Sequence, residues 1–183
     1  REHIIPQHLK ARDNCISAIA SRDPAKAQAV ATQFQIPHVL PDYEALLASE
    51  HIDAIYIPLP TSQHAEWAIK AANAGKHVLV EKPLALQADD ILPVKAAAEA
   101  NGIIIAEAFM VHYHPQWQQV TDWLQQGAIG RLRHIQSAFS YYNRDPGNMR
   151  NQPGLGGGGI PDIGVYPTVT ARHITGQEPL KVR

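Results

Sequence analysis

The sequence predicts an α/β fold: a Rossmann-type, doubly wound parallel sheet, followed by the start of an α+β domain with a large, mainly antiparallel sheet. Three observations support it. Short apolar runs alternate with helical patterns of about ten residues over residues 16–106, as in βαβ units. After His114 one amphipathic helix is followed by one long alternating strand. The change of pattern places the domain boundary between residues 1–112 and residues 113–183.

In the first domain, strands end at turn signals and helices begin at capping residues. Asp23 is placed to cap the first helix and Pro24 suits its first turn. Gly75 and the pair Asn101 and Gly102 are stop signals for later helices. The expected strands are residues 16–20, 54–57, 77–80 and 103–106, and the expected helices are residues 25–34, 42–47, 62–74 and 88–100.

The second domain begins with a predicted helix over residues 115–126, which Gly127 ends. Residues 132–142 alternate between apolar and polar side chains, which predicts a strand of an antiparallel sheet with one exposed face. A further helix is expected to begin at Pro161, because proline suits the first helical turn.

Composition excludes several classes of partner. Lys and Arg (16) nearly balance Asp and Glu (17), so neither nucleic acid nor an anionic membrane surface is expected as a partner. No apolar run approaches the roughly 20 residues of a membrane-spanning helix. The single cysteine, Cys15, fits a reducing compartment, so we expect a cytoplasmic protein. The sequence does not begin with Met and reads as a piece of a longer protein, which leaves a targeting signal before residue 1 open.

Unusual residues follow three of the expected strands. They are Ser21 and Arg22, then Pro58, Leu59, Pro60 and His64, and finally Glu81, Lys82 and Pro83. Open α/β sheets bind ligands at the carboxyl ends of their strands. Two prolines fix φ and remove two backbone donors, which suits the wall of a cofactor groove, although such turns are more often only turns. Ser21 stands where a carboxylate would hold NAD, so the neighbouring Arg22 favours NADP, with NAD as the alternative. The plainer interpretation is that Arg22 is only a solvated loop residue.

Two segments far apart carry the candidate chemistry. Lys82 is placed to hydrogen-bond a substrate hydroxyl, unless it merely pairs with Glu81. After the glycines of residues 154–159, Asp162 and Tyr166 are four residues apart and share one helix face. Tyr166 can pass a proton to or from a carbinol oxygen if a nearby cation lowers its pKa. The plainer interpretation is a tyrosine that fills a core and an aspartate that caps a helix.

Taken together, these residues resemble the Gfo/Idh/MocA family of NAD(P)-dependent oxidoreductases, in the branch similar to glucose–fructose oxidoreductase and dimeric dihydrodiol dehydrogenase. The matching segments run in the family's order: residues 20–23, 57–60, 75–84, 107–110 and 157–166. The resemblance implies that Lys82 contacts the substrate or the nicotinamide ribose. It also implies that Asp162 and Tyr166 supply proton transfer.

The resemblance implies hydride transfer between NADP(H) and a hydroxyl or carbonyl carbon of a sugar, polyol or trans-diol, in a homo-oligomer (dimer or tetramer). No metal is expected, since His112 and His114 alone are weak ligand candidates. The family's G-x-G-x-x-G loop is not found in the sequence, nor is most of the second domain's sheet, so this chain alone is expected to bind NADP(H) poorly. The rival hypotheses are a dinucleotide-binding sensor without turnover, and a reductase of a tetrapyrrole or imine.

Overall fold

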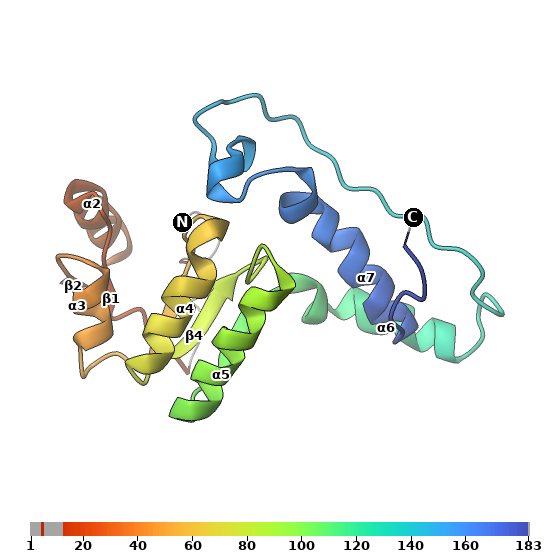
Figure 1. The fold of residues 1–183 in the computed structure, drawn as a ribbon, viewed down its shortest axis with the longest axis horizontal. Helices are drawn as coiled ribbons and strands as arrows, with labels where there is room; N and C mark the ends of the chain where they lie inside the picture. Colours follow the sequence, from red (N-terminus) through yellow and green to blue (C-terminus); the bar gives the residue numbers. More distant parts are fainter. Residues whose placement is uncertain (1–4, 6–12, 183) are drawn as a thin grey trace.

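The computed structural model describes residue 5 and residues 13–182, and its first part is built on parallel strands (Figure 1). Strand β4 (His77–Glu81) lies between β3 (Ala54–Ile57) and β5 (Ile105–Ala108) in a three-stranded sheet. Strands β1 (Ala18–Ile19) and β2 (His38–Val39) form a second, two-stranded sheet. Every pair is parallel. The predicted Rossmann-type parallel sheet with its helices is therefore confirmed.

Helices connect these strands in the predicted order, with capping residues where the sequence places them. Asp23 accepts a hydrogen bond from the backbone N–H of Lys26 (3.1 Å), and Asp42 accepts one from the N–H of Ala45 (2.7 Å). Each cap satisfies a donor that has no partner within the first helical turn. The helices are α2 (Pro24–Phe34), α3 (Tyr43–Ala48), α4 (His64–Asn73) and α5 (Ile91–Asn101), with 3₁₀ turns η1 (Thr61–Gln63) and η2 (Ala88–Asp90).

The main core lies between α4 and the three-stranded sheet. Ala68 and Ala71 of α4 are fully buried, and these small side chains let the helix approach β4 closely. Val78 and Val80 of β4 fill the same core. This packing makes β4 the most enclosed strand, so its carboxyl end is held firmly where Lys82 begins the next loop.

After β5, the described residues form helices and no sheet. These elements are η3 (Met110–His112), α6 (Pro115–Gln125), η4 (Met149–Asn151), η5 (Pro153–Leu155), the π-helical turn η6 (Ile160–Gly164) and α7 (Val165–Thr175). The strand predicted over residues 132–142 is wrong for this structure: the segment is a long trace along one side of the molecule and pairs with no described strand (Figure 1). An alternating pattern becomes a strand only when a neighbouring strand accepts its hydrogen bonds. None of the described helices is long and apolar enough to cross a membrane.

Candidate functional site

Lys82 is the residue around which the site is built. It follows the last residue of β4 and precedes Pro83 through a cis peptide bond. Its ammonium group donates hydrogen bonds to the main-chain carbonyl oxygen of Asp162 and to the carboxylate oxygen Oδ1, at 3.4 Å for the latter. The same nitrogen lies 4.8 Å from the ring centroid of Tyr166. The structure thus brings Lys82, Asp162 and Tyr166 together.

Asp162 is also bound by two residues to which the sequence assigned no role. The Tyr141 hydroxyl donates to Oδ2, and Nε of Arg150 donates to Oδ1 at 3.2 Å. Burial alone would raise the pKa of Asp162, but the Tyr141 hydrogen bond and the charges of Lys82 and Arg150 lower it overall. Asp162 is therefore ionised at neutral pH. Local spacing gave no signal for Tyr141 or Arg150, because the three segments meet only through the tertiary fold.

Tyr166 is enclosed by aromatic rings. Its ring centroid lies 5.1 Å from that of Phe109 and 5.1 Å from that of Phe139. Burial, followed by the negative charges of Glu81 and Asp162, raises the pKa of Tyr166 above its usual value. The charge of Arg150 lowers this pKa, but by less than burial and the two carboxylates raise it, so the net lowering expected from a nearby cation does not occur. Tyr166 keeps its proton at neutral pH, as a proton donor must.

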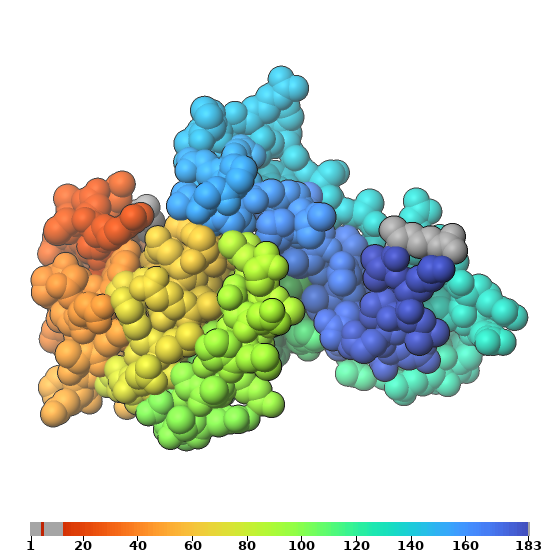
Figure 2. Space-filling model, viewed as in Figure 1, coloured from red at the N-terminus to blue at the C-terminus, as the bar shows by residue number. Residues whose placement is uncertain are grey.

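The glycine run before Asp162 packs closely against Thr61 and Leu86, on the same side of the molecule as Lys82. A Cβ on Gly156 would lie 2.9 Å from Cβ of Thr61 and 3.0 Å from Cδ1 of Leu86, and Gly156 also has a positive φ of 80°. Figure 2 shows the segment around the run resting against the region of η1 and the start of α4. The backbone N–H of Asp162 then donates to the carbonyl oxygen of Gly158 (3.0 Å), which begins the η6 turn.

Glu81 has its own partner on the neighbouring strand. The hydroxyl of Tyr56 on β3 donates to Oε1 of Glu81 at 2.6 Å. Burial, and then this hydrogen bond to a carboxylate, raise the pKa of Tyr56. Lys82 is bonded to Asp162 instead, so the alternative that Lys82 merely pairs with Glu81 does not hold.

His64 is buried and links two of the predicted loops. It is only 1% exposed, and its ring nitrogens lie 2.7 Å from the carbonyl oxygen of Leu59 and 2.8 Å from that of Pro83. Pro58, Leu59 and Pro60 therefore lie beside the loop of Lys82, as the prediction of a shared site requires. The His64 side chain contacts protein, so any effect on a cofactor comes through the position of these loops.

Ser21 and Arg22 lie at the carboxyl end of β1 and do not contact the Lys82 group. The Ser21 hydroxyl accepts a hydrogen bond from the backbone N–H of Asp23 (3.2 Å). Arg22 is exposed and has no ion-pair partner in the part of the chain that the structure describes. Arg22 follows β1 and Lys82 follows β4, so the two cations lie at the carboxyl ends of different strands. This spacing fits a long dinucleotide with a phosphate on its adenosine ribose.

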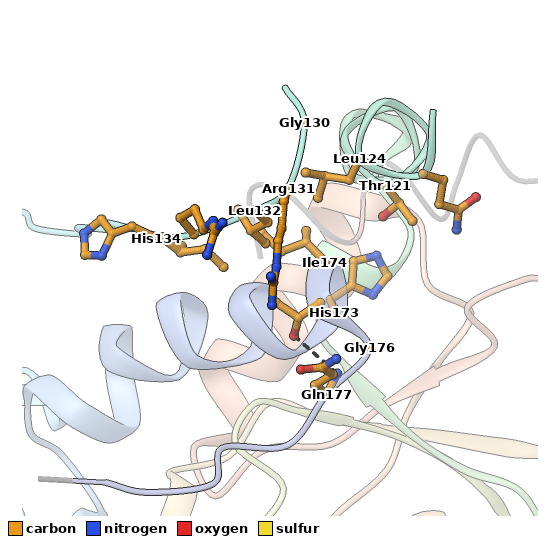
Figure 3. A pocket seen from close by; sticks show the side chains of 14 residues that line it. Thr121, Leu124, Gly130, Arg131, Leu132, His134, His173, Ile174, Gly176 and Gln177 are labelled. Carbon is orange, nitrogen blue, oxygen red and sulfur yellow. Dashed lines mark hydrogen bonds between the residues drawn. The ribbon is translucent and has the colours of Figure 1, made fainter. Parts of the chain in front are cut away.

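A groove of about 760 Å³ lies elsewhere, at the carboxyl end of α7 (Figure 3). Arg131 and His134, which follow α6, and His173 of α7 line it. None of the predicted site residues belongs to this groove, so we place the chemistry at Lys82 rather than at this hollow.

Comparison with known proteins assigns both parts of the chain. Residues 1–109 match a family model described as an oxidoreductase family with an NAD-binding Rossmann fold, and residues 117–183 match the Gfo/Idh/MocA C-terminal domain. The dTDP-3,4-didehydro-2,6-dideoxy-alpha-D-glucose 3-reductase of Saccharopolyspora spinosa is 40% identical over 93% of this chain and 51% of its own length. The D-xylose 1-dehydrogenase (NADP(+)) 2 of Haloferax volcanii is 40% identical over 94% and 53%. The chain thus spans about half the length of these curated relatives.

The solved structures agree. Crystalline KijD10, a 3-ketoreductase from Actinomadura kijaniata in complex with NADP and TDP-benzene, matches with a TM-score of 0.90 at 37% identity, over 93% of this chain and 52% of that chain. Two KijD10 variants also match, one with a lysine replaced by alanine and one with a tyrosine replaced by phenylalanine. The two replaced residues are as many positions apart as Lys82 and Tyr166. With both of its parts matched in order, this chain belongs to the Gfo/Idh/MocA family of oxidoreductases.

Proposed function

We propose that the protein transfers a hydride between NADP(H) and a hydroxyl or carbonyl carbon of a sugar, polyol or trans-diol. The observation that carries the proposal is the meeting of Lys82, Asp162 and a protonated Tyr166 at the carboxyl end of β4. Nicotinamide supplies the hydride when it is bound. The chain's own residues then have to hold the substrate oxygen and move one proton.

Lys82 is suited to hold that oxygen. A lysine ammonium has three donors, and Asp162 accepts two of them. The third remains for a substrate oxygen, where a fixed positive charge stabilises the negative charge that develops during reduction. Asp162 offsets the lysine charge and keeps the side chain in place.

Tyr166 is suited to give the proton. When a carbonyl carbon accepts a hydride, its oxygen must gain a proton, and the Tyr166 hydroxyl holds one at neutral pH, as a tyrosine does whose pKa is not lowered. A protonated Tyr166 suits carbonyl reduction, the direction in which tyrosine acts as the general acid. Reduction of a keto sugar is also what the names of the Saccharopolyspora and Actinomadura relatives describe.

The sharpest test is a substrate screen of the full-length protein, with keto sugar nucleotides and NADPH, and with aldoses, inositols and trans-diols and NADP⁺. We expect turnover with at least one class, and a Tyr166→Phe variant should lose about 10²- to 10⁴-fold in kcat while NADPH affinity stays near that of the wild type. Tyr142→Phe is the matched control, because Tyr142 is 84% exposed. Tight dinucleotide binding without turnover of any class would favour the sensor instead.

The NADP preference has its own test. We expect Arg22→Ala to weaken NADPH binding about 10- to 100-fold and to leave NADH binding unchanged, because only NADPH carries the 2′-phosphate. An equal loss for both cofactors would contradict this role.

The domain boundary between residues 112 and 113 is also a proposal. It is supported by the two family models, which match residues 1–109 and residues 117–183 and so leave the boundary between them. A homo-oligomer stays a prediction.

A further inference from the structure

Two residues outside the family resemblance reach the same carboxylate as Lys82. Tyr141 comes from the extended segment of residues 132–142, and Arg150 comes from η4. The main chain of Arg150 lies against the glycine run, because its carbonyl oxygen accepts the N–H of Gly158 at 2.9 Å. The segments that carry Arg150 and Asp162 are thus packed together, and Tyr141 reaches Asp162 from a separate segment.

The contacts on Asp162 leave its carboxylate little freedom. Oδ2 accepts the hydroxyl of Tyr141, while Oδ1 is shared by Nε of Arg150 (3.2 Å) and Nζ of Lys82 (3.4 Å). The Asp162 side chain is only 15% exposed, so water competes weakly for these oxygens. With both oxygens held, the carboxylate cannot turn away from Lys82.

We propose that Tyr141 and Arg150 are positioning residues: they hold the ionised carboxylate of Asp162 in the orientation that keeps Lys82 over the face of Tyr166. This inference rests on the proposed function for its effect on turnover. Tyr141 and the side chain of Arg150 are themselves about half exposed, at 49% and 50%. Losing either therefore removes little packing, and the hydrogen bond to Asp162 is the main thing lost.

The charges around Asp162 give a readout independent of turnover. The groups that face it are Lys82 after β4, Tyr141 of the extended segment and Arg150 of η4. Tyr166 lies close by, where the charges of Asp162 and Glu81 both act on it. The first three stabilise the ionised form, so removing the Tyr141 hydroxyl or the Arg150 charge should raise the titration midpoint of Asp162.

The experiment compares Tyr141→Phe and Arg150→Gln with two matched controls, Tyr142→Phe and Arg144→Gln. Arg144 lies over the ring of Tyr142 at 5.7 Å, and neither contacts Asp162. In the full-length protein, we expect each test variant to lower kcat about 3- to 10-fold, no more than the loss of the Asp162 charge itself, and to leave the KM for NADPH unchanged. Carboxyl ¹³C NMR of the protein without ligands, assigned with Asp162→Asn, should show a higher Asp162 midpoint in both test variants only.

Arg150→Lys separates charge from geometry, because lysine keeps the positive charge at this position. The titration midpoint of Asp162 should therefore lie nearer the wild-type value in Arg150→Lys than in Arg150→Gln. An unchanged midpoint in both test variants would overturn the inference, whatever the kinetics show. If the wild-type protein turns over no substrate, the proposed function fails, while the midpoints still decide whether Tyr141 and Arg150 hold Asp162. Thermal melts of each variant show whether it is folded, and equal kcat losses in the controls would also count against positioning.

Discussion

Lys82 is bound to Asp162 at two points, the main-chain carbonyl oxygen and the carboxylate, although 80 residues separate them in the sequence. The Lys82 side chain is 12% exposed, so this double contact is largely shielded from water. One of the two acceptors belongs to the backbone and survives any substitution of Asp162. The lysine and the aspartate should therefore respond differently to mutation.

We expect Asp162→Asn to lower kcat about 10-fold, because Lys82 keeps its backbone acceptor while it loses the charge of the carboxylate. Lys82→Met should lower kcat about 10²- to 10³-fold, because the donor that stabilises the substrate oxygen is gone. Steady-state kinetics of the full-length protein measure both. Equal losses would mean that Lys82 depends on the carboxylate alone. Lys95→Met is a control on an exposed helical lysine, and it should leave kcat unchanged.

The pH dependence of reduction follows from the raised pKa of Tyr166. A raised pKa means that the hydroxyl loses its proton at a higher pH than the ordinary value of 10.0. The protonated donor thus dominates through neutral pH, and kcat for carbonyl reduction should stay flat to about pH 9 as far as Tyr166 determines it. Measurement of kcat from pH 6 to 10 with saturating NADPH tests this. A basic limb near pH 8 that disappears in Tyr166→Phe would show that the pKa is lowered instead.

The glycine run offers a stability test. A Cβ on Gly157 would lie 2.5 Å from the carbonyl oxygen of Met149 and 2.6 Å from that of Arg150, and these backbone atoms cannot move aside cheaply. We expect Gly157→Ala to destabilise the fold by about 1–3 kcal/mol in urea denaturation. Gly154→Ala is the matched control, because nothing lies within 4 Å of its added Cβ. A cost within about 0.5 kcal/mol for both would mean that the run can shift.

The sequence was sufficient for the elements whose signals are local. The strand that ends before Lys82 and the helices capped by Asp23 and Asp42 depend on residues within a few positions of each other, and the structure forms them. The meeting of Lys82 with Asp162 is not local, and spacing alone left both without a partner. The family resemblance assigned Lys82, Asp162 and Tyr166 to one site but did not predict this contact.

Tyr141, Arg150 and the 132–142 segment show what sequence could not supply. Tyr141 stands in a pattern typical of a strand, yet strand formation depends on a neighbour, and no described segment provides one. Arg150 lies in a loop whose path is set by glycine packing rather than by any periodicity. The direction of the Tyr166 pKa shift likewise depends on how deeply the ring is buried and on which charges lie near it, and both are set by the tertiary fold.

His64 should act on the site entirely through the two loops that it joins. Its ring is buried between the carbonyl oxygens of Leu59 and Pro83, so His64→Ala removes the ring N–H that one of these oxygens accepts and leaves a cavity beside both. We expect a loss of about 2–4 kcal/mol in the free energy of unfolding. The loops should also loosen, which raises the KM for NADPH more than it lowers kcat. His51→Ala is the control, since this exposed side chain should cost less than about 0.5 kcal/mol. A stable His64→Ala variant with a selective loss of kcat would instead mean that His64 takes part in the reaction directly.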